Sequence, residues 1–481
     1  MRSQGVPEIK ALFLPFPAHG HMLPALDIAK LFTSHGVNCA IVTTPLNAPI
    51  FTKSIQRTQH LGDKITLKIV KFPAVEAGLP QDCENAEKVT SEEMSLKFVK
   101  AAAMLQDPFE KILRDVQPQC LVADMFFPWA SHVAAKFGIR RLSFLGTSFF
   151  SLCAGECLRL YKPQVQVSSD SEPFEIPGLP DTVEVTRKQI PYAIRSGEES
   201  EINKWMESCV EDELKSYGVL VNSFYELEPT YADYFRNVLK RRAWHIGPVS
   251  LCNREKEEKA RRGKETAVAA HECLTWLDSK DPNSVVYVCF GSMSHFDASQ
   301  LREIAVALEA SGKQFIWVVR KSRDGDENED WLPSGFEKRM KNRGLIVRGW
   351  APQVLILEHK AIGAFVTHCG WNSTLEGISS GVPLVTWPLF AEQFLNEKLV
   401  TQVLRIGVSV GAKEYARFGG ETVKSERIEE AINRVMEGEE AEKIRSKAKA
   451  FGDLAKKAVE RGGSSYNDLK ALIEELRYYQ T

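Results

Sequence analysis

Two histidines near the amino end of the chain have the chemistry of a general base. His19 and His21 lie in PFPAHGHMLP, where an apolar run ends and a glycine allows a tight turn before a helix. Imidazole has an unperturbed pKa of about 6.5, so a histidine in a cleft can take a proton from a hydroxyl near neutral pH. Asp124 ends another apolar run and could either orient such an imidazole or cap the following helix. The residues alone leave open which histidine is the base.

A segment in the second half has the features of an anion-binding turn. The apolar run Gly363–Thr367 leads through a His-Cys-Gly turn into a helix that starts at Trp371. The first amides of a helix lack intrahelical partners and the helix dipole is positive there, so such a turn suits a diphosphate, although an ordinary strand–turn–helix looks the same. His368 and Ser373 can add hydrogen-bond donors. Glu376, one turn into the helix, can accept hydrogen bonds from ribose hydroxyls.

The elements that must position these residues are short apolar runs that alternate with amphipathic stretches. Runs rich in Val, Ile and Phe are typical of strands covered on both faces, and their alternation with helices predicts parallel sheets. Helical patterns include Met22–His35 and Ala298–Ser311. The expected strands are Ala11–Phe16, Cys39–Thr44, Ile65–Phe72, Cys120–Asp124, Arg141–Gly146, Gly218–Asn222, Val285–Gly291, Phe315–Arg320, Gly344–Trp350, Gly363–His368, Val382–Trp387 and Gly407–Val410.

The chain length calls for more than one domain. Its 481 residues exceed the roughly 250–300 that a single core supports. We expect two facing, doubly wound, Rossmann-like α/β domains, with ligands in the cleft at the carboxyl ends of the strands. The expected parts are a first domain over 1–252, a charged and solvated linker over 253–272, a second domain over 273–455, and a C-terminal helix over 456–481 that packs back on the first domain.

Composition excludes several classes of partner. The net charge of −2 gives no electrostatic reason to expect nucleic acid or an anionic membrane. We find no apolar run of the ~20 residues that span a bilayer and no secretion signal. The ten cysteines are scattered without metal-ligand spacing, which indicates reduced, buried thiols. We therefore expect a cytoplasmic protein, and a monomer.

The 44 residues from Trp350 to Gln393 resemble, along their whole length, the plant secondary-product glycosyltransferase signature of family 1 UDP-sugar enzymes. The stretches VADMFFPWA, GTSFFSLC and NSFYELE are similar to those of phenylpropanoid and flavonoid glucosyltransferases, including enzymes that act on coumarins such as scopoletin. The resemblance implies the GT-B fold, with the active site in the interdomain cleft. It also implies an acceptor-binding first domain, a UDP-sugar-binding second domain and UDP-glucose as co-substrate.

The resemblance assigns donor-site roles position by position. Trp350 would stack on uracil, Gln353 would contact its edge or the ribose, and Glu376 would hold the ribose. Gln393 favours glucose, whereas Glu392 stands where many members have Asp, which leaves the donor sugar less fixed. The residues expected at the diphosphate are His368, Asn372 and Ser373; those facing the sugar are Trp371, Glu392 and Gln393; Ala351, Gly370 and Ser292 complete the UDP-sugar set.

On the acceptor side, the family's Gly-His motif selects His21 as the base, because His19 stands where the family often has Gln. The same resemblance makes Asp124 the orienting carboxylate and Thr147 a sugar contact. Aromatic side chains that follow these motifs, together with the region around Ile190–Met206, are candidates for the acceptor pocket, although they could equally belong to the core. These aromatics are Phe126, Phe127, Phe149 and Phe150.

The expected reaction is inverting transfer of glucose from UDP-glucose to a hydroxyl of small plant phenolics such as flavonoids, coumarins and phenylpropanoids. The same chemistry on triterpenoid or steroid acceptors is an alternative. A UDP-sugar epimerase and a non-catalytic protein that binds lipophilic molecules are alternatives from other classes. Asp324-Gly325-Asp326 matches a metal motif of another glycosyltransferase fold but lies in an acidic loop without that context. We therefore expect neither a metal nor another cofactor.

Overall fold

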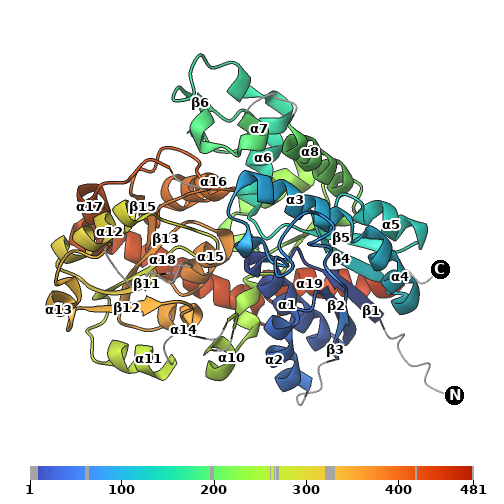
Figure 1. Ribbon diagram of the computed structural model, residues 1–481, viewed down its shortest axis with the longest axis horizontal. Helices are drawn as coiled ribbons and strands as arrows, with labels where there is room; N and C mark the ends of the chain where they lie inside the picture. The colour runs from blue at the N-terminus through green and yellow to red at the C-terminus, as the bar shows by residue number, and fades with distance from the viewer. Residues whose placement is uncertain are drawn as a thin grey trace. The chain divides into compact units, whose positions relative to one another are not determined.

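The chain forms two compact units. The computed structural model describes residues 9–59, 64–195, 200–260, 262–264, 266, 270–319, 331–417 and 420–478. The first unit comprises Met1–Thr147, Glu198–Arg254 and Ala458–Thr481, and the second comprises Ser148–Gly197 and Glu255–Lys457. Each unit is built on one large parallel sheet with helices in the connections, as the element labels in Figure 1 show. The predicted pair of parallel α/β sheets is confirmed.

The first unit contains a seven-stranded sheet in the order β3-β2-β1-β4-β5-β8-β9, and its paired strands are parallel. From β1 the chain moves outward to β2 and β3 and then returns to pair β4 with the other side of β1. The point where the strand order reverses therefore lies between β1 and β4, which is where open α/β sheets bind ligands. The strands are β1 (Ile9–Leu14), β2 (Val37–Thr43), β3 (Ile65–Ile69), β4 (Cys120–Asp124), β5 (Arg140–Phe144), β8 (Gly218–Val221) and β9 (Ala243–His245).

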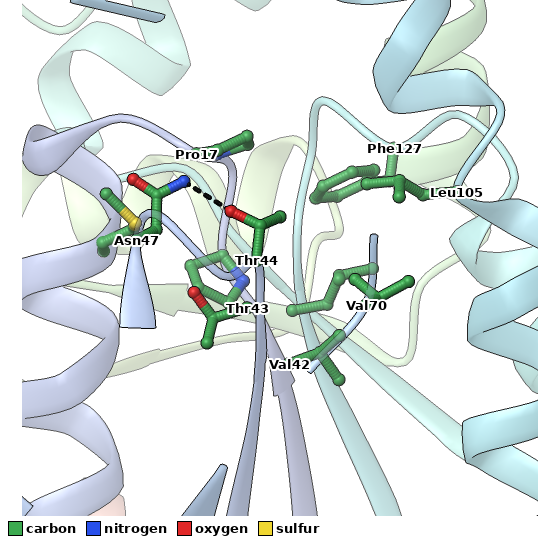
Figure 2. A pocket seen from close by; sticks show the side chains of 11 residues that line it. Pro17, Val42, Thr43, Thr44, Asn47, Val70, Leu105 and Phe127 are labelled. Atoms are coloured by element: carbon green, nitrogen blue, oxygen red, sulfur yellow. Dashed lines mark hydrogen bonds between the residues drawn. The ribbon is translucent and has the colours of Figure 1, made fainter. Parts of the chain in front are cut away.

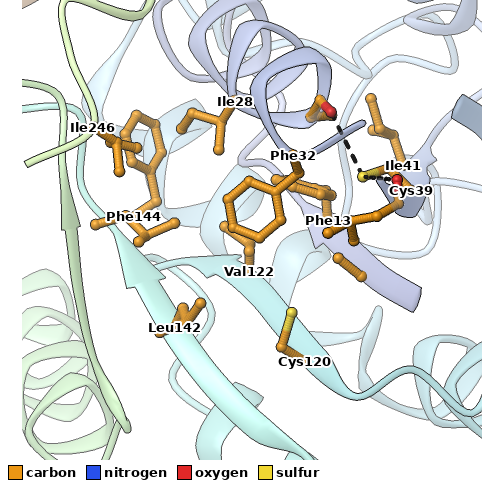
Figure 3. Packing of buried hydrophobic residues seen from close by; sticks show 14 of the residues in the cluster. Phe13, Ile28, Phe32, Cys39, Ile41, Cys120, Val122, Leu142, Phe144 and Ile246 are labelled. Carbon is orange, nitrogen blue, oxygen red and sulfur yellow. Dashed lines mark hydrogen bonds between the residues drawn. The ribbon is translucent and has the colours of Figure 1, made fainter. Parts of the chain in front are cut away.

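One face of this sheet is covered by helices from both ends of the chain. Helix α1 (His19–Ser34) places Phe32 edge-on against Phe13 of β1, with ring centroids 5.5 Å apart. Figure 3 shows these rings beside Val122 and Leu142 of neighbouring strands. Four apolar side chains of α19 (Ser464–Tyr478) belong to the same core, which explains why the end of the chain groups with the first unit. The other helices of this unit are α2 (Ala48–Gln59), α3 (Glu92–Ala103), α4 (Gln106–Val116), α5 (Ala130–Lys136), α8 (Glu201–Leu214) and α9 (Pro229–Asp233).

Helix α1 begins earlier than its apolar pattern predicts. The sequence indicated a start near Met22, but the backbone amide of Met22 already donates to the carbonyl of Ala18 at 2.9 Å, the spacing of an α-helical bond. Ala18 is the extended N-cap residue, with φ of −142°. His21 therefore lies in the first helical turn, so the helix backbone sets the direction of its side chain.

The second unit repeats the topology with six strands in the order β12-β11-β10-β13-β14-β15, again with parallel pairs. Its strand order reverses between β10 and β13. The strands are β10 (Val285–Cys289), β11 (Gln314–Val319), β12 (Gly344–Arg348), β13 (Ile362–Thr367), β14 (Leu384–Thr386) and β15 (Gly407–Ser409), with a separate antiparallel pair, β6 (Pro173–Glu175) and β7 (Glu184–Thr186).

The helices of the second unit complete the crossovers. They are α6 (Phe149–Tyr161), α7 (Tyr192–Arg195), α10 (Lys256–Ala260), α11 (Ala270–Asp278), α12 (Ala298–Ala310), α13 (Phe336–Met340), α14 (Gln353–Leu357), α15 (Trp371–Ser379), α16 (Gln393–Lys398), α17 (Ser425–Met436) and α18 (Gly438–Val459), the last of which continues into the first unit. Among the helices described, none has the length and apolar character needed to cross a membrane.

Candidate active site

His21 and Asp124 form a close pair in the first unit. The Nδ1 atom of His21 lies 2.6 Å from Oδ2 of Asp124. Because a carboxylate can only accept, Nδ1 carries the proton, and Nε2 is left as the proton acceptor of the ring. The Asp124 side chain is fully buried, whereas 22% of the His21 side chain is exposed. The pair therefore has the arrangement of a general base with an orienting carboxylate.

Strand order explains why residues 103 positions apart meet. β1 and β4 are neighbours in register, with Leu14 opposite Ala123, so their carboxyl ends lie side by side. His21 follows β1 after a short turn, and Asp124 is the last residue of β4. The backbone amide of Phe126 donates to Oδ1 of Asp124 at 3.1 Å and keeps the carboxylate pointed at the imidazole. Both residues thus lie at the switch point of the first sheet.

His19 lies in a different environment. Its side chain is 5% exposed, and its Nδ1 atom lies 2.6 Å from Oε1 of Glu87. Glu87 belongs to a short 3₁₀ turn, Ala86–Lys88, and the backbone amide of Ala86 donates to the carbonyl of Pro17. His19 thus anchors this turn to the β1–α1 connection. Both histidines have a carboxylate oxygen 2.6 Å from Nδ1, so exposure separates them: 22% of the His21 side chain is accessible, against 5% of the His19 side chain.

Two aromatic rings lie against His21, and a third stacks on one of them. Phe16 and Phe126 have ring centroids 5.7 and 5.6 Å from that of His21. Trp205 of α8 stacks on Phe126 at 5.4 Å with an interplanar angle of 28°, and its indole Nε1 has no hydrogen-bond partner among the described residues. This apolar wall suits a flat, lipophilic acceptor. Trp205 falls in the region 190–206 that the sequence pointed to.

The other predicted acceptor aromatics are more enclosed. Phe127 is 1% exposed and lines a cavity of about 20 Å³ together with Pro17, Thr44 and Asn47, as Figure 2 shows. That volume holds about one water molecule, far less than a drug-sized ligand needs. Phe149 and Phe150 are the first two residues of α6, and both are fully buried. Of these four rings, Phe126 is the one that lies against His21, and the other three are packed.

Thr147 follows β5, and its hydroxyl is buried without a hydrogen-bond partner in the described part of the chain. A Cβ atom placed on the neighbouring Gly146 would lie 4.0 Å from the carbonyl oxygen of Gly20, so this turn runs close to the start of α1. The hydroxyl of Thr147 thus remains available as a polar contact on the same edge of the sheet as His21.

The predicted anion-binding turn lies at the switch point of the second sheet. β13 ends at Thr367, Cys369 adopts the left-handed backbone conformation with φ of +63°, and Gly370 is the N-cap of α15. The first amides of α15 therefore point out of the helix end, as anion binding requires. Ser292 follows the adjacent strand β10, whose Cys289 is opposite Thr367. The predicted anion-binding turn and the loop that carries Ser292 are thus neighbours.

His368 is held between the two loops by close packing. A Cβ atom would lie 2.8 Å from its Nε2 at Gly291 and 2.4 Å at Gly370, so only glycine fits at either position. Although part of the His368 surface is accessible, burial lowers its pKa to about 4. The imidazole is therefore neutral near pH 7 and can still offer one N–H to a diphosphate oxygen. Asn372 and Ser373 follow in the first turn of α15.

A hydrogen-bonded chain links the residues expected to hold the nucleoside. Nε2 of Gln353 donates to Oε2 of Glu376 at 2.7 Å and to Oγ of Ser373 at 3.1 Å. The hydroxyl of Tyr287 donates to Oε1 of Gln353 at 3.4 Å. Ala351, which precedes α14, is buried, and its carbonyl accepts from the amide of Gln353. The structure therefore brings the predicted ribose residue Glu376 into contact with the start of α14.

The linker covers part of the predicted nucleoside site. Nη1 of Arg262 donates to Oε1 of Glu376 at 2.5 Å, and the Arg262 side chain is only 12% exposed. The indole of Trp350 donates to the carbonyl of Arg262, and a Cβ atom on Gly263 would lie 2.3 Å from its ring. The expectation of a solvated linker is wrong at these two residues, because Glu376 offers a buried carboxylate that a cation can neutralise. A nucleoside that uses Trp350 and Glu376 must displace them.

The three predicted sugar residues lie at the starts of α15 and α16 and differ in their contacts. Trp371 is 2% exposed. Glu392 precedes α16, and its carboxylate accepts from Nδ2 of Asn396. Oε1 of Gln393 accepts from the amides of Leu389 and Phe390. These bonds identify which end of the Gln393 amide is oxygen and leave its Nε2 without a partner among the described residues, as a donor for a sugar hydroxyl.

Sequence reasoning missed two residues of this site. Arg262 lies in a run of charged residues that is typical of a solvated loop. The only sign of a close contact there was the glycine next to it. Asn396 lies three residues beyond the signature segment, and its one signal was a polar residue in an otherwise apolar helix start. Within the described ranges, no group of three or more His, Cys, Asp or Glu side chains could hold a metal ion, and Asp324-Gly325-Asp326 lies outside those ranges.

The combination of two parallel α/β units, a histidine–aspartate pair and an anion-binding turn beside nucleoside residues is that of transferases that use nucleotide-activated sugars. The protein-family model "UDP-glucoronosyl and UDP-glucosyl transferase" matches residues 239–446. Scopoletin glucosyltransferase of Nicotiana tabacum is 55% identical over 98% of this chain and 99% of its own length. UDP-glucose flavonoid 3-O-glucosyltransferase 7 of Fragaria ananassa is 56% identical over 99% and 98%, respectively.

A solved structure agrees over the same extent. The crystal structure of Glycyrrhiza uralensis UGT73P12 complexed with glycyrrhetinic acid 3-O-monoglucuronide superimposes with a TM-score of 0.92, at 46% identity, over 98% of this chain and 96% of that one. The chain therefore belongs to the plant family 1 UDP-glycosyltransferases, with their GT-B fold. It is a UDP-glycosyltransferase with hexosyltransferase activity.

Proposed function

We propose that this enzyme transfers glucose from UDP-glucose to a hydroxyl of a small plant phenolic, with inversion at the anomeric carbon. The observation that carries the proposal is the 2.6 Å contact between His21 and Asp124 beside an aromatic wall. The relatives named for scopoletin and for a flavonoid support a flat phenolic acceptor, and the name of the second supports UDP-glucose as donor. The ten free thiols support a reducing compartment, the cytoplasm.

In the proposed reaction the acceptor hydroxyl lies beside Nε2 of His21. As its oxygen forms a bond to the anomeric carbon, the proton passes to Nε2, and Asp124 stabilises the imidazolium. The bond from the anomeric carbon to the diphosphate breaks on the opposite face, and UDP leaves with the electron pair. An α-linked donor thus yields a β-glucoside. General-base assistance of this kind contributes roughly 10²–10⁴ in rate.

The donor-site residues have separate tasks in this proposal. The amides at the start of α15, with Ser373 and His368, stabilise the charge that grows on the departing diphosphate. Trp350, Gln353 and Glu376 hold the uridine once Arg262 and Gly263 have moved aside. The Nε2 donor of Gln393 and the carboxylate of Glu392 bind sugar hydroxyls. Transfer also requires that the acceptor oxygen beside His21 reach the anomeric carbon of the bound donor.

The test is a panel of acceptors incubated with UDP-glucose and analysed by mass spectrometry. It contains a hydroxycoumarin, a flavonol, a simple phenylpropanoid and the triterpenoid glycyrrhetinic acid. We expect a mass gain of one hexose on the phenolics and faster turnover than on the triterpenoid. Preference for the triterpenoid would contradict the acceptor class. A new UDP-sugar formed without any acceptor would indicate an epimerase, and absence of UDP release with every phenol would contradict the proposed transfer.

A further inference from the structure

Asn396, in the first turn of α16, is fully buried and makes hydrogen bonds in three directions. Its Nδ2 atom donates to the backbone carbonyl of Cys369 at 2.9 Å and to Oε1 of Glu392 at 3.2 Å. Its Oδ1 atom accepts from the hydroxyl of Ser151 at 2.8 Å. All four residues belong to the second unit. A buried amide with both of its polar atoms bonded in this way has one orientation only.

The first of these contacts holds the diphosphate turn. Cys369 has φ of +63°, a left-handed conformation that a non-glycine residue adopts only where the surroundings enforce it. The carbonyl that Asn396 binds belongs to the peptide unit between Cys369 and Gly370, the N-cap of α15. By fixing this peptide plane, Asn396 sets the direction in which the chain enters the helix and hence where the first amides point.

The second contact restrains Glu392, the side chain proposed to bind the sugar. The amide of Asn396 donates to one oxygen of the Glu392 carboxylate, the group proposed to accept a hydroxyl of the sugar. Without that donor, the carboxylate would lose a partner that restricts its rotation, and ordering it in the transition state would cost more entropy. One NH₂ group therefore connects the turn under the leaving diphosphate to the side chain at the transferred sugar.

We propose that Asn396 is a positioning residue for transfer, coupling the diphosphate turn to the sugar-binding carboxylate Glu392. The proposal rests on the proposed function, because it takes the roles of that turn and of Glu392 from it. It implies that removing the Asn396 amide weakens interactions with the sugar-bearing donor more than interactions with UDP alone. It also implies that the effects of Asn396 and Glu392 substitutions are not independent, since one residue acts through the other.

The test compares Asn396→Ala and Asn396→Asp with the parent enzyme by calorimetry and by steady-state kinetics. We expect both variants to lose about 10- to 100-fold in kcat/KM for UDP-glucose and at least about tenfold in kcat. The Kd for UDP should rise by a smaller factor than the Kd for UDP-glucose, because UDP contacts the diphosphate turn but lacks the sugar that Glu392 is proposed to bind. Aspartate retains the size and the acceptor toward Ser151 but cannot donate to Cys369, so it should not rescue the enzyme.

A matched control is Asn253→Ala. Asn253 is likewise buried, donates to Asp27 at 2.8 Å and to the carbonyl of Ser250, and accepts from Lys30 at 2.7 Å. It belongs to the first unit, whereas the residues proposed for the diphosphate and the sugar belong to the second. Its loss should lower the melting temperature by an amount similar to that of Asn396→Ala and leave kcat/KM for UDP-glucose within about threefold.

A double-mutant cycle completes the experiment. In an enzyme that already carries Glu392→Ala, the additional Asn396→Ala change should cost at least about threefold less in kcat/KM than it costs in the parent, because only the bond that Asn396 donates to Cys369 is then left to lose. Fully additive losses, equal losses of UDP and UDP-glucose affinity, or full activity of Asn396→Asp would each overturn the proposal. The parent enzyme tests the proposed function separately. If it binds UDP-glucose but glucosylates no phenol, the acceptor proposal fails. The calorimetric comparison of UDP-glucose with UDP then still tests the role of Asn396.

Discussion

Glu397, next to Asn396 in α16, is a carboxylate held in an apolar interior. Only 5% of it is exposed, and its Oε2 atom accepts hydrogen bonds from the hydroxyls of Thr386 at 2.8 Å and Ser409 at 2.9 Å. Burial raises its pKa from 4.5 to about 7, although the two hydroxyls and the charge of Lys398 offset part of the effect. Its proton therefore comes off near neutral pH in the folded enzyme and near pH 4.5 in the unfolded chain.

The stability of the enzyme should depend on this proton. Between about pH 4.5 and 7 the folded state binds it and the unfolded chain does not, so stability falls as pH rises through this window. Glu397→Gln cannot ionise. It should match the parent at pH 4.5 and exceed its free energy of unfolding at pH 8 by up to about 3 kcal/mol, measured by denaturant titration at both pH values. The same difference at both pH values would contradict this account.

Glu303 of α12 provides a control of opposite sign. Burial raises its pKa, but hydrogen bonds from the backbone amide of Ser425 and from Lys424 outweigh that effect and hold the pKa below its ordinary value. Its ionised form is therefore favoured by folding, and that stability is present above the unfolded pKa and lost in acid. Glu303→Gln should be less stable than the parent at pH 8, in contrast to Glu397→Gln.

Residue types alone indicated two candidate bases, His19 and His21, and Asp124 as a possible partner, because all three follow strand ends; the resemblance then selected His21. The contact of His19 with Glu87 could not be predicted, because it depends on the path of a loop. Gln393 was assigned to the sugar by resemblance. That its oxygen is taken by two loop amides, leaving only the nitrogen as donor, required coordinates.

At the scale of elements, the apolar runs located the strands because buried parallel strands are apolar on both faces. Strand β9 (Ala243–His245) was missed because it follows three charged residues and ends in a polar one, so no apolar run marks it. The start of α1 was misplaced by three residues because Gly20 suggested a turn, whereas the helical bond to Ala18 already includes it. The high density of charged residues predicted a solvated linker, but the Arg262 side chain is paired with Glu376 and shielded from solvent.

The contact between the linker and α15 predicts an effect on donor affinity. Arg262 and a ribose would use the same Glu376 carboxylate, and a ligand that must first displace an internal group binds more weakly. Arg262→Ala should therefore lower the Kd for UDP by about three- to tenfold, measured by isothermal titration calorimetry. Weaker binding of UDP would mean instead that Arg262 helps to hold the nucleotide.

The same linker offers a matched control. Lys259, three residues earlier, pairs with Glu358 at 2.7 Å, and Glu358 has no assigned part in donor binding. Lys259→Ala removes an equal charge from the same segment without touching Glu376. Its Kd for UDP should stay within about twofold of the parent value, so that a general effect of linker charge is distinguished from competition at Glu376.

At the scale of the whole molecule, the chemistry is divided between two units. His21 and Asp124 belong to the first unit, and the residues proposed for UDP-glucose belong to the second. The sequence indicated two domains through its length and its repeated alternation of strands and helices. It did not indicate that Ser148–Gly197 groups with the second unit, because that depends on packing between α6 and α16, which are far apart in the chain.

Because the two sets of residues belong to different units, one substitution should lower turnover without changing donor binding. His21→Ala, assayed with UDP-glucose and the best phenolic acceptor, should reduce kcat by about 10²–10⁴ while the Kd for UDP stays within about twofold. That result would support His21 as the base that takes the acceptor proton. Turnover retained to within tenfold, or UDP binding lost together with turnover, would contradict it.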